Sequence, residues 1–164
     1  MDEQLQKDLN AFHIPRYQEL PDFGLRLEQV TRYVSRYVPA PVTASMVSNY
    51  VKQKIIPGPE KKSYDVDSIA YLIIVSYLKS VVSMEDIRLL LGVQQDNYQL
   101  STAYNYFCEE LETLLRYVIG TQAAPPIAEQ TDRQKQLLRT ALFSITYKMY
   151  LDYRIAMLRC GDAE

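Results

Sequence analysis

Apolar residues recur at helical spacing along most of the chain, and short polar or proline-rich stretches separate the repeats. The first repeat covers about residues 24–38 and spaces its apolar residues three or four positions apart (Leu27, Val30, Val34 and Tyr37). Such a stripe predicts an amphipathic helix with one buried face. Pro39 and Pro41 cannot continue this helix, because proline lacks the backbone N–H and clashes with the preceding turn.

A second, shorter helix is predicted over 43–54. Thr43 is a favourable N-cap, since its hydroxyl oxygen can accept a hydrogen bond from the first turn. Apolar residues line one face (Ala44, Val47, Tyr50 and Val51), and polar residues line the other (Ser45, Ser48, Asn49 and Lys52). Pro57 should end the helix, because it disfavours helical geometry at the residue before it. A loop over 57–63 follows, with two adjacent lysines (Lys61 and Lys62).

The next segment, about 66–81, is apolar nearly all round. Asp65 opens it as an N-cap. Its β-branched residues also suit a buried strand, and periodicity alone does not separate the two. The apolar run continues through Leu78 without a break, which favours a helix at the centre of the core. Ser83 then caps a short helix that we expect to end at Gly92, a residue type suited to a helix C-cap.

Two further helices are predicted near the C-terminus, over about 102–119 after a Ser101 cap and about 131–159 after a Thr131 cap. The second helix carries one apolar set close to a heptad (Leu138, Leu142, Ile145, Met149, Tyr153 and Ala156). A second apolar set lies beside it (Leu137, Ala141, Leu151, Ile155 and Leu158). One face could serve the chain itself and the other a second subunit. A helix buried within a single chain fits the pattern equally well.

These elements predict an all-α fold in three parts. Residues 1–22 form a charged lead with a helical turn near 5–12, residues 23–92 form a small helical domain, and residues 93–164 form a C-terminal helical region. Nearly half of the chain is hydrophobic (48%), which is ample for a core.

Charge is unevenly distributed along the chain. The whole chain has a formal net charge of −2. Residues 23–64 nevertheless contain seven basic residues against two acidic ones, a net charge of +5, so the remainder carries −7. A basic segment in an otherwise acidic chain is what binding to phosphates predicts. Chance clustering on a solvated face is the simpler alternative.

No set of residues predicts catalysis, a metal site or a cofactor. Cys108 and Cys160 lie far apart and fit no metal or redox spacing, which suggests reduced thiols. His13 is the single histidine and has no acidic or cysteine neighbours in sequence. The acids of the helix 102–119 resemble a solvated face (Glu109, Glu110 and Glu112). With no signal peptide and no apolar run long enough to cross a bilayer, we expect a cytoplasmic protein that is not an enzyme.

Several residues carry a resemblance to the MerR-type DNA-binding domain. They are Tyr50, Ile55-Ile56-Pro57, Tyr64, Leu72 and Ser83-Met84-Glu85-Asp86-Ile87. That family has a short recognition helix ending in tyrosine, an aliphatic pair and proline, and a basic wing that also ends in tyrosine. The resemblance covers about 25–92. With Glu19-Leu20-Pro21-Asp22 included, the chain is more similar still to a bacterial family of this type known as domain of unknown function 1836.

The resemblance implies a winged helix-turn-helix that binds double-stranded DNA as a homodimer. The helix 43–54 would enter the major groove, and the wing 57–63 would contact phosphates. The residues facing base edges would be Ser45, Ser48 and Asn49. The residues near phosphates would be Thr43, Lys52, Lys54, Lys61 and Lys62.

Departures from the MerR pattern keep two other functions open. The family usually has an arginine where this chain has Ser48, Asn49 replaces a second tyrosine, and the wing arginine is matched only by Lys62. A protein-interaction adaptor with the same fold but no DNA affinity is therefore one alternative. A sensor of an unknown small-molecule effector is another, with a pocket lined by tyrosines (Tyr98, Tyr104, Tyr106, Tyr147 and Tyr150).

Overall fold

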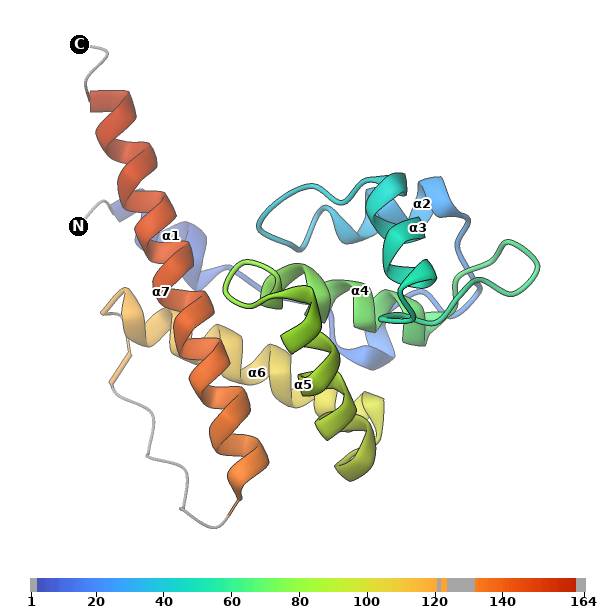
Figure 1. Ribbon diagram of the computed structural model, residues 1–164. Coiled ribbons are helices and arrows are strands. Elements are labelled where there is room, and N and C mark those ends of the chain that lie inside the picture. The colour runs from blue at the N-terminus through green and yellow to red at the C-terminus, as the bar shows by residue number, and fades with distance from the viewer. Residues whose placement is uncertain (1–2, 121, 124–131, 162–164) are drawn as a thin grey trace. The chain divides into compact units, whose positions relative to one another are not determined.

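The computed structural model describes residues 3–120, 122–123 and 132–161, and this part of the chain is helical (Figure 1). The helices are α1 (Glu3–Asn10), α2 (Leu27–Val34), α3 (Ala44–Lys52), α4 (Val66–Leu78), α5 (Met84–Asn97), α6 (Leu100–Val118) and α7 (Arg133–Gly161), with a 3₁₀ turn at Tyr17–Glu19. Within the described residues, β-structure is confined to two isolated bridges, Leu25 with Tyr64 and Glu60 with Ser63. The predicted all-α fold is confirmed.

The chain divides into two compact units. The central unit is Ile14–Cys108, and the terminal unit combines Met1–His13 with Glu109–Glu164. The helix α6 contributes its first turns to the central unit and the rest to the terminal unit.

The core of the central unit is built around α4. Asp65 caps the helix by accepting from the Ser68 N–H at 2.9 Å, as predicted. Every residue from Ser68 to Leu78 is buried. The helix α2 packs against α3 and α4. The Tyr77 hydroxyl donates to the carbonyl of Tyr37 in the turn after α2. The prediction of a helix rather than a strand is therefore confirmed.

The helix α2 is shorter than the predicted 24–38. Leu25 is extended, because its N–H and C=O pair with the backbone of Tyr64 at 2.9 and 2.7 Å. The helix begins only after Arg26, whose N–H donates to Gln29 Oε1 at 2.9 Å. The apolar spacing of these helices predicts a core of ten residues in the N-terminal part of the chain (Leu27, Val30, Val34, Val47, Tyr50, Ile69, Leu72, Ile73, Ile87 and Leu90). Eight of them are buried, while Leu27 and Leu90 are half-buried.

The helix α5 begins after Ser83, whose hydroxyl accepts from the Asp86 N–H at 3.1 Å as predicted. The prediction that it ends at Gly92 is wrong. Its third turn has partners on α4, since Gln94 and Gln95 both hydrogen-bond the Tyr71 hydroxyl. These contacts carry the helix past the glycine, so the predicted boundary between 92 and 93 falls inside α5.

The two C-terminal helices also begin differently from the predictions. Ser101 lies within α6, because the N–H of Ala103 already bonds the carbonyl of Gln99. In α7 the capping group is the Asp132 carboxylate, which accepts from the N–H groups of Gln134 and Lys135. The predicted cap Thr131 lies outside the described residues.

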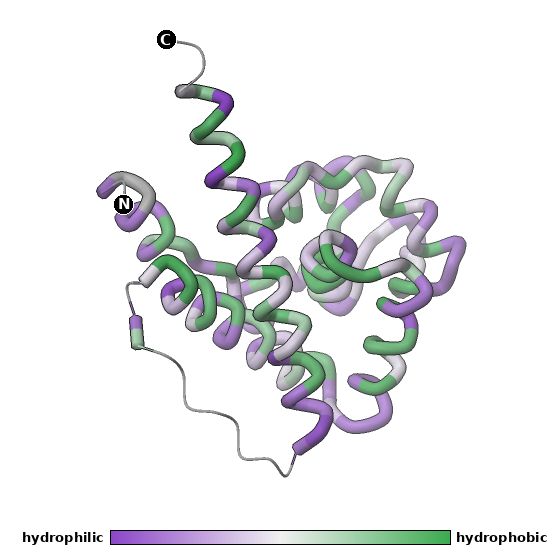
Figure 2. Tube along the Cα trace, turned by 60° about the vertical axis from the view of Figure 1, so that its left-hand side comes forward, coloured by the Kyte–Doolittle hydropathy of each residue, from purple (hydrophilic) through white to green (hydrophobic). Residues whose placement is uncertain are grey.

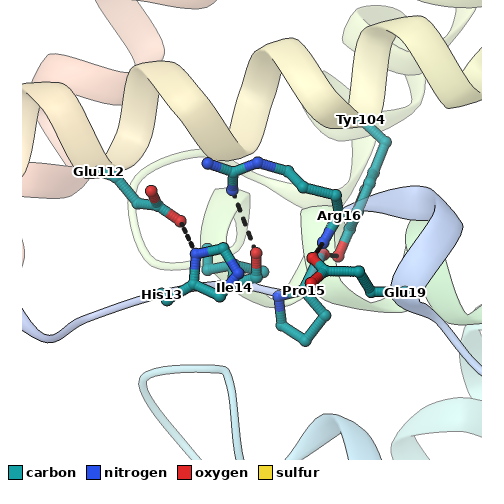
Figure 3. A network of polar contacts seen from close by, with 7 residues as sticks. All are labelled: His13, Ile14, Pro15, Arg16, Glu19, Tyr104 and Glu112. Atoms are coloured by element: carbon teal, nitrogen blue, oxygen red, sulfur yellow. Dashed lines mark hydrogen bonds and ion pairs between the residues drawn. The ribbon is translucent and has the colours of Figure 1, made fainter.

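The segment 14–20, predicted as part of a charged lead, belongs to the interior of the central unit. Ile14 and Leu20 are buried. The Tyr17 N–H donates to Asn105 Oδ1 at 2.8 Å, and the Tyr104 hydroxyl donates to the Pro15 carbonyl at 2.9 Å. Figure 3 shows the Tyr104 side chain reaching Pro15 from its helix. Polar groups of α6 therefore hold this segment in place.

The terminal unit is held together by one face of α7. Leu142, Ile145 and Thr146 are buried there. Arg139 makes a two-pronged ion pair with Glu110 of α6 at 3.0 and 3.1 Å. The second predicted apolar set stays largely at the surface, and Figure 2 shows hydrophobic segments continuing along α7 towards its C-terminal end. The two apolar sets predicted for this helix thus have different environments.

The prediction of a solvated acidic face on α6 holds for Glu109, which is exposed, and is wrong for Glu110 and Glu112. Glu112 is buried, and its Oε1 lies 3.2 Å from His13 Nδ1 (Figure 3). Glu110 is 15% exposed in its pair with Arg139. The two carboxylates satisfy cationic or N–H partners within the terminal unit, a requirement that buried acids normally meet.

Candidate nucleic-acid interface

The helix α3 separates its residues into a packed face and an open face. Thr43 caps it by accepting from the Met46 N–H at 3.2 Å, as predicted. Val47 and Tyr50 are buried against the rest of the unit. The polar residues of the opposite face are exposed (Ser45, Ser48, Asn49 and Lys52). The helix therefore presents a polar surface that a second molecule could reach.

The end of α3 is set by Lys54 and not, as predicted, by Pro57. Lys54 has a φ of 57°, in the left-handed region. Its N–H bonds the Val51 carbonyl at 2.9 Å, and the N–H of Ile55 bonds the Tyr50 carbonyl at 2.9 Å. This is the Schellman arrangement, in which glycine normally occupies the left-handed position. A lysine here accepts a conformational cost that glycine would avoid.

A short hairpin with a two-residue turn follows α3 and projects from the central unit (Figure 1). Glu60 and Ser63 exchange backbone hydrogen bonds of 3.0 and 2.8 Å. The residues between them are Lys61 and Lys62, with φ of 49° and 64°. Positive φ at both central positions is typical of a type I′ turn, where Asn-Gly is the preferred pair. The tip of the hairpin is therefore formed by two lysines in a conformation that lysine rarely adopts.

The base of the hairpin is fixed by the backbone pairing of Leu25 with Tyr64. Gly24 lies against Ser63 so closely that a Cβ at Gly24 would be 2.1 Å from the Ser63 oxygen. Gly24 itself has a φ of 73°. The Ser63 hydroxyl could rotate away from such a Cβ, so glycine is favoured here chiefly by the left-handed backbone conformation.

The segment 23–64, which contains α3 and the hairpin, has a net charge of +5. All seven basic residues of 23–64 are exposed (Arg26, Arg32, Arg36, Lys52, Lys54, Lys61 and Lys62). Arg32 pairs with Glu28 at 3.2 Å. Across the described ranges, no carboxylate lies within ion-pair distance of the four lysines. Their charges are therefore available to an anionic partner.

The family model of a domain of unknown function, DUF1836, matches residues 15–107. The chain belongs to this family. The matched residues nearly coincide with the central unit, Ile14–Cys108, so the DUF1836 domain includes both the segment 14–20 and the first turns of α6. No curated protein and no solved structure matches the chain.

Within the DUF1836 domain, all eight predicted contact residues are exposed on α3, its C-terminal turn and the hairpin. Two further residues touch this surface, and the sequence analysis did not single out either of them. Gln53 Nε2 donates to Asn49 Oδ1 at 3.1 Å, and Arg88 Nη2 donates to the Gln53 carbonyl at 2.9 Å. The spacing of Gln53 four residues after Asn49 on a helix is a signal that could have identified the first contact.

Tyrosines of the DUF1836 domain serve packing. Burial raises the pKa of Tyr50 and of Tyr64, so both stay neutral at physiological pH. Burial is the main cause, and a hydrogen bond to Asp67 the second, of a rise in the pKa of Tyr17 to about 12. Tyr104, one of the residues predicted to line an effector pocket, is fully buried, and its hydroxyl donates a hydrogen bond to the Pro15 carbonyl.

The polar contacts around residues 14–19 are made largely to the backbone. In the DUF1836 domain, Arg16 Nη1 donates to the Ile14 carbonyl at 3.1 Å, and the Arg16 N–H donates to Glu19 at 2.6 Å (Figure 3). These contacts stabilise the backbone of the segment. In the described part of the chain, no three His, Cys, Asp or Glu residues gather as metal ligands would. The helices in that part are also too short or too polar to span a membrane.

Proposed function

We propose that the DUF1836 domain of this protein binds double-stranded DNA in the manner of a MerR-like winged helix-turn-helix and regulates transcription. The helix α3 lies in the major groove, where Ser45, Ser48 and Asn49 face base edges. The hairpin 57–63 is the wing, and its lysines follow the phosphate backbone together with Thr43, Lys52 and Lys54.

The observation that carries this proposal is the conformation of three lysines. In the part of the chain that the structure describes, the non-glycine residues with positive φ are Lys54, Lys61 and Lys62. A left-handed conformation costs a residue with a Cβ roughly 1–2 kcal/mol, and glycine removes this cost. All three lysines are exposed, next to α3 or at the hairpin tip. Lysine at three such positions supports a role for the charged side chains.

The surrounding geometry supports the same function. Polar side chains are exposed on α3, and the base of the hairpin is paired through the backbone of Leu25 and Tyr64. Rigid placement of a basic hairpin beside an exposed helix is what docking in a groove and along its phosphates requires. An adaptor that binds a protein partner would not need unpaired lysines at strained positions.

The exposed set on α7 supports a homodimer. Leu137, Leu151 and Leu158 are 45%, 53% and 69% exposed, seven or fourteen residues apart on one helix. An apolar stripe of this period normally packs against a second helix, and dimers of helix-turn-helix proteins contact paired half-sites. Leu142 and Ile145 are buried within the chain, so substituting them would test folding and not association. Leu151→Glu with Leu158→Glu should convert a dimer to a monomer in light scattering at micromolar concentration.

DNA binding is tested first by selection from random duplexes with the full chain, followed by titrations at several salt concentrations. The substitution of Lys52, Lys61 and Lys62 by alanine should lower the salt slope by about three units, because each phosphate contact contributes about one. A charge-matched control replaces three lysines of the terminal unit (Lys7, Lys135 and Lys148). The control should bind like the wild type. If selection enriches nothing and both triple variants bind random duplex as the wild type does, the DNA-binding function is excluded and the adaptor takes its place.

A further inference from the structure

The exposed amide of Asn49 is already engaged by the protein. Gln53, one turn further along α3, donates its side-chain N–H to Asn49 Oδ1 at 3.1 Å. This contact uses one of the two lone pairs of the oxygen and orients the Asn49 amide with its oxygen towards Gln53. The NH₂ group is then the part of the amide that is left to donate to a second molecule. Pairing with adenine would instead require the oxygen and the NH₂ group both to face the base, because adenine offers one acceptor and one donor in the major groove.

The position of Gln53 is in turn fixed by Arg88 of α5, 35 residues away in sequence. Arg88 Nη2 donates to the Gln53 carbonyl at 2.9 Å. Gln53 is the C-cap residue of α3, where carbonyls lack partners within the helix and a cation is favoured by the helix dipole. Arg88 therefore satisfies one of these carbonyls and holds the last turn of α3 against α5.

We propose that Gln53 and Arg88 are positioning residues that make Asn49 select guanine at its base position. Guanine presents two acceptors in the major groove, N7 and O6, and these match the NH₂ group that Gln53 leaves available on Asn49. This inference rests on the proposed DNA binding by α3. The Asn49–Gln53 contact gains strength when DNA excludes water from it, because hydrogen bonds are stronger at low dielectric.

The test compares base preference among variants of the full chain. Selection with the wild type should enrich guanine at one position, and Asn49→Ala should lose that preference with an affinity loss of about 5- to 150-fold on the selected site. Gln53→Leu keeps the side-chain size but frees Asn49 Oδ1, so the enriched base should change from guanine to adenine. A structural defect alone would weaken binding to all sites without changing the base.

A double-mutant cycle separates positioning from an independent contact. In the Asn49→Ala background, Gln53→Leu should change the ratio of specific to random binding by less than about twofold, since the two residues act through one amide. The proposal is overturned if, in the double variant, the two substitutions change the ratio of specific to random binding by the sum of their separate effects in free energy. It is also overturned if Gln53→Leu keeps the guanine preference of the wild type. If the wild type enriches a site but Asn49→Ala leaves every base preference intact, DNA binding stands and this inference falls.

Arg88 is tested by rescue. Arg88→Ala should weaken binding to the selected site several-fold and broaden the preference at the guanine position, while Arg88→Lys restores both, because lysine can also donate to the Gln53 carbonyl. Arg159→Ala, at the far end of α7, removes the same charge and should leave both measurements unchanged. If Arg88→Ala behaves as Arg159→Ala does, Arg88 has no positioning role.

Discussion

The helix α4 and the segment Lys54–Ser63 are close neighbours in sequence but differ in almost every physical respect. The helix is capped by Asp65, and its residues from Ser68 onwards are buried. The preceding segment is mostly exposed, and three of its lysines have left-handed backbone conformations. The difference shows that burial is concentrated in α4, whereas the lysine segment contains three unfavourable backbone conformations. Natural proteins often have such a cost at the sites that they use.

The largest expected effect that distinguishes the two regions comes from shortening a buried side chain of α4. Ile73 is fully buried, so Ile73→Ala should lower the free energy of unfolding by about 2–5 kcal/mol, through lost burial and a residual cavity. Leu89→Ala is the matched control, since Leu89 is 66% exposed on α5 and its loss should cost less than about 0.5 kcal/mol. Denaturant titration measures both. Equal losses in the two variants would mean that α4 is not the core.

The second expected effect is an increase in the free energy of unfolding. Replacing the hairpin tip with Asn-Gly (Lys61→Asn with Lys62→Gly) should raise the free energy of unfolding by about 1–2 kcal/mol, because these residues suit a type I′ turn. The same change should lower the salt slope of DNA binding by about two units. The control Lys61→Ala with Lys62→Ala removes the charges but keeps a Cβ at both positions. It should lose binding equally without gaining stability, and a gain in this control would refute the role assigned to strain.

A third effect compares one substitution at two positions. Lys54→Gly should stabilise the protein by about 1 kcal/mol, because Lys54 occupies the left-handed position of a Schellman motif. Lys52→Gly, two residues earlier and inside α3, should destabilise it by about 0.5–1 kcal/mol. Thermal unfolding of both variants gives the signs directly. Destabilisation by both would show that the end of α3 is not limited by backbone strain.

The smallest effect concerns pH and the edge of α4. Tyr17 donates to Asp67 of α4, and its pKa is raised from 10.0 to about 12. A raised pKa in the folded state stabilises the fold below the unfolded value, and the contribution is lost as pH rises from about 10 through 12. Tyr17→Phe should flatten this alkaline decline in denaturant midpoints measured between pH 8 and pH 11. An unchanged decline would assign it to other tyrosines, such as Tyr33, whose pKa is also about 12.

The parts of this molecule that could be predicted from sequence depend on local pattern. Thr43, Asp65 and Ser83 cap helices as predicted, because a capping side chain needs only its own first turn. The open face of α3 followed from its periodicity for the same reason.

The parts that could not be predicted depend on distant contacts or on unfavourable conformations. Gly92 lies inside α5 because Tyr71 of α4 hydrogen-bonds Gln94 and Gln95 in the next turn. Lysine gives no sequence signal for positive φ, so Lys54, Lys61 and Lys62 looked like ordinary loop residues. The contact of Arg88 with Gln53 joins segments 35 residues apart, which no local pattern reveals.

The docking of the segment 14–20 onto α6 has a consequence for synthesis of the chain. Tyr17 and Asn105 are 88 residues apart, and Pro15 and Tyr104 are 89 apart. Chains emerge from the ribosome N-terminus first, so the earliest residues of this domain must wait for nearly the last before their hydrogen bonds can form. Closing so long a loop before its contacts form slows folding. A recombinant fragment that begins at 23 or stops at 92 would lack one partner of each of these hydrogen bonds. The shortest fragment that should fold independently is therefore 14–108.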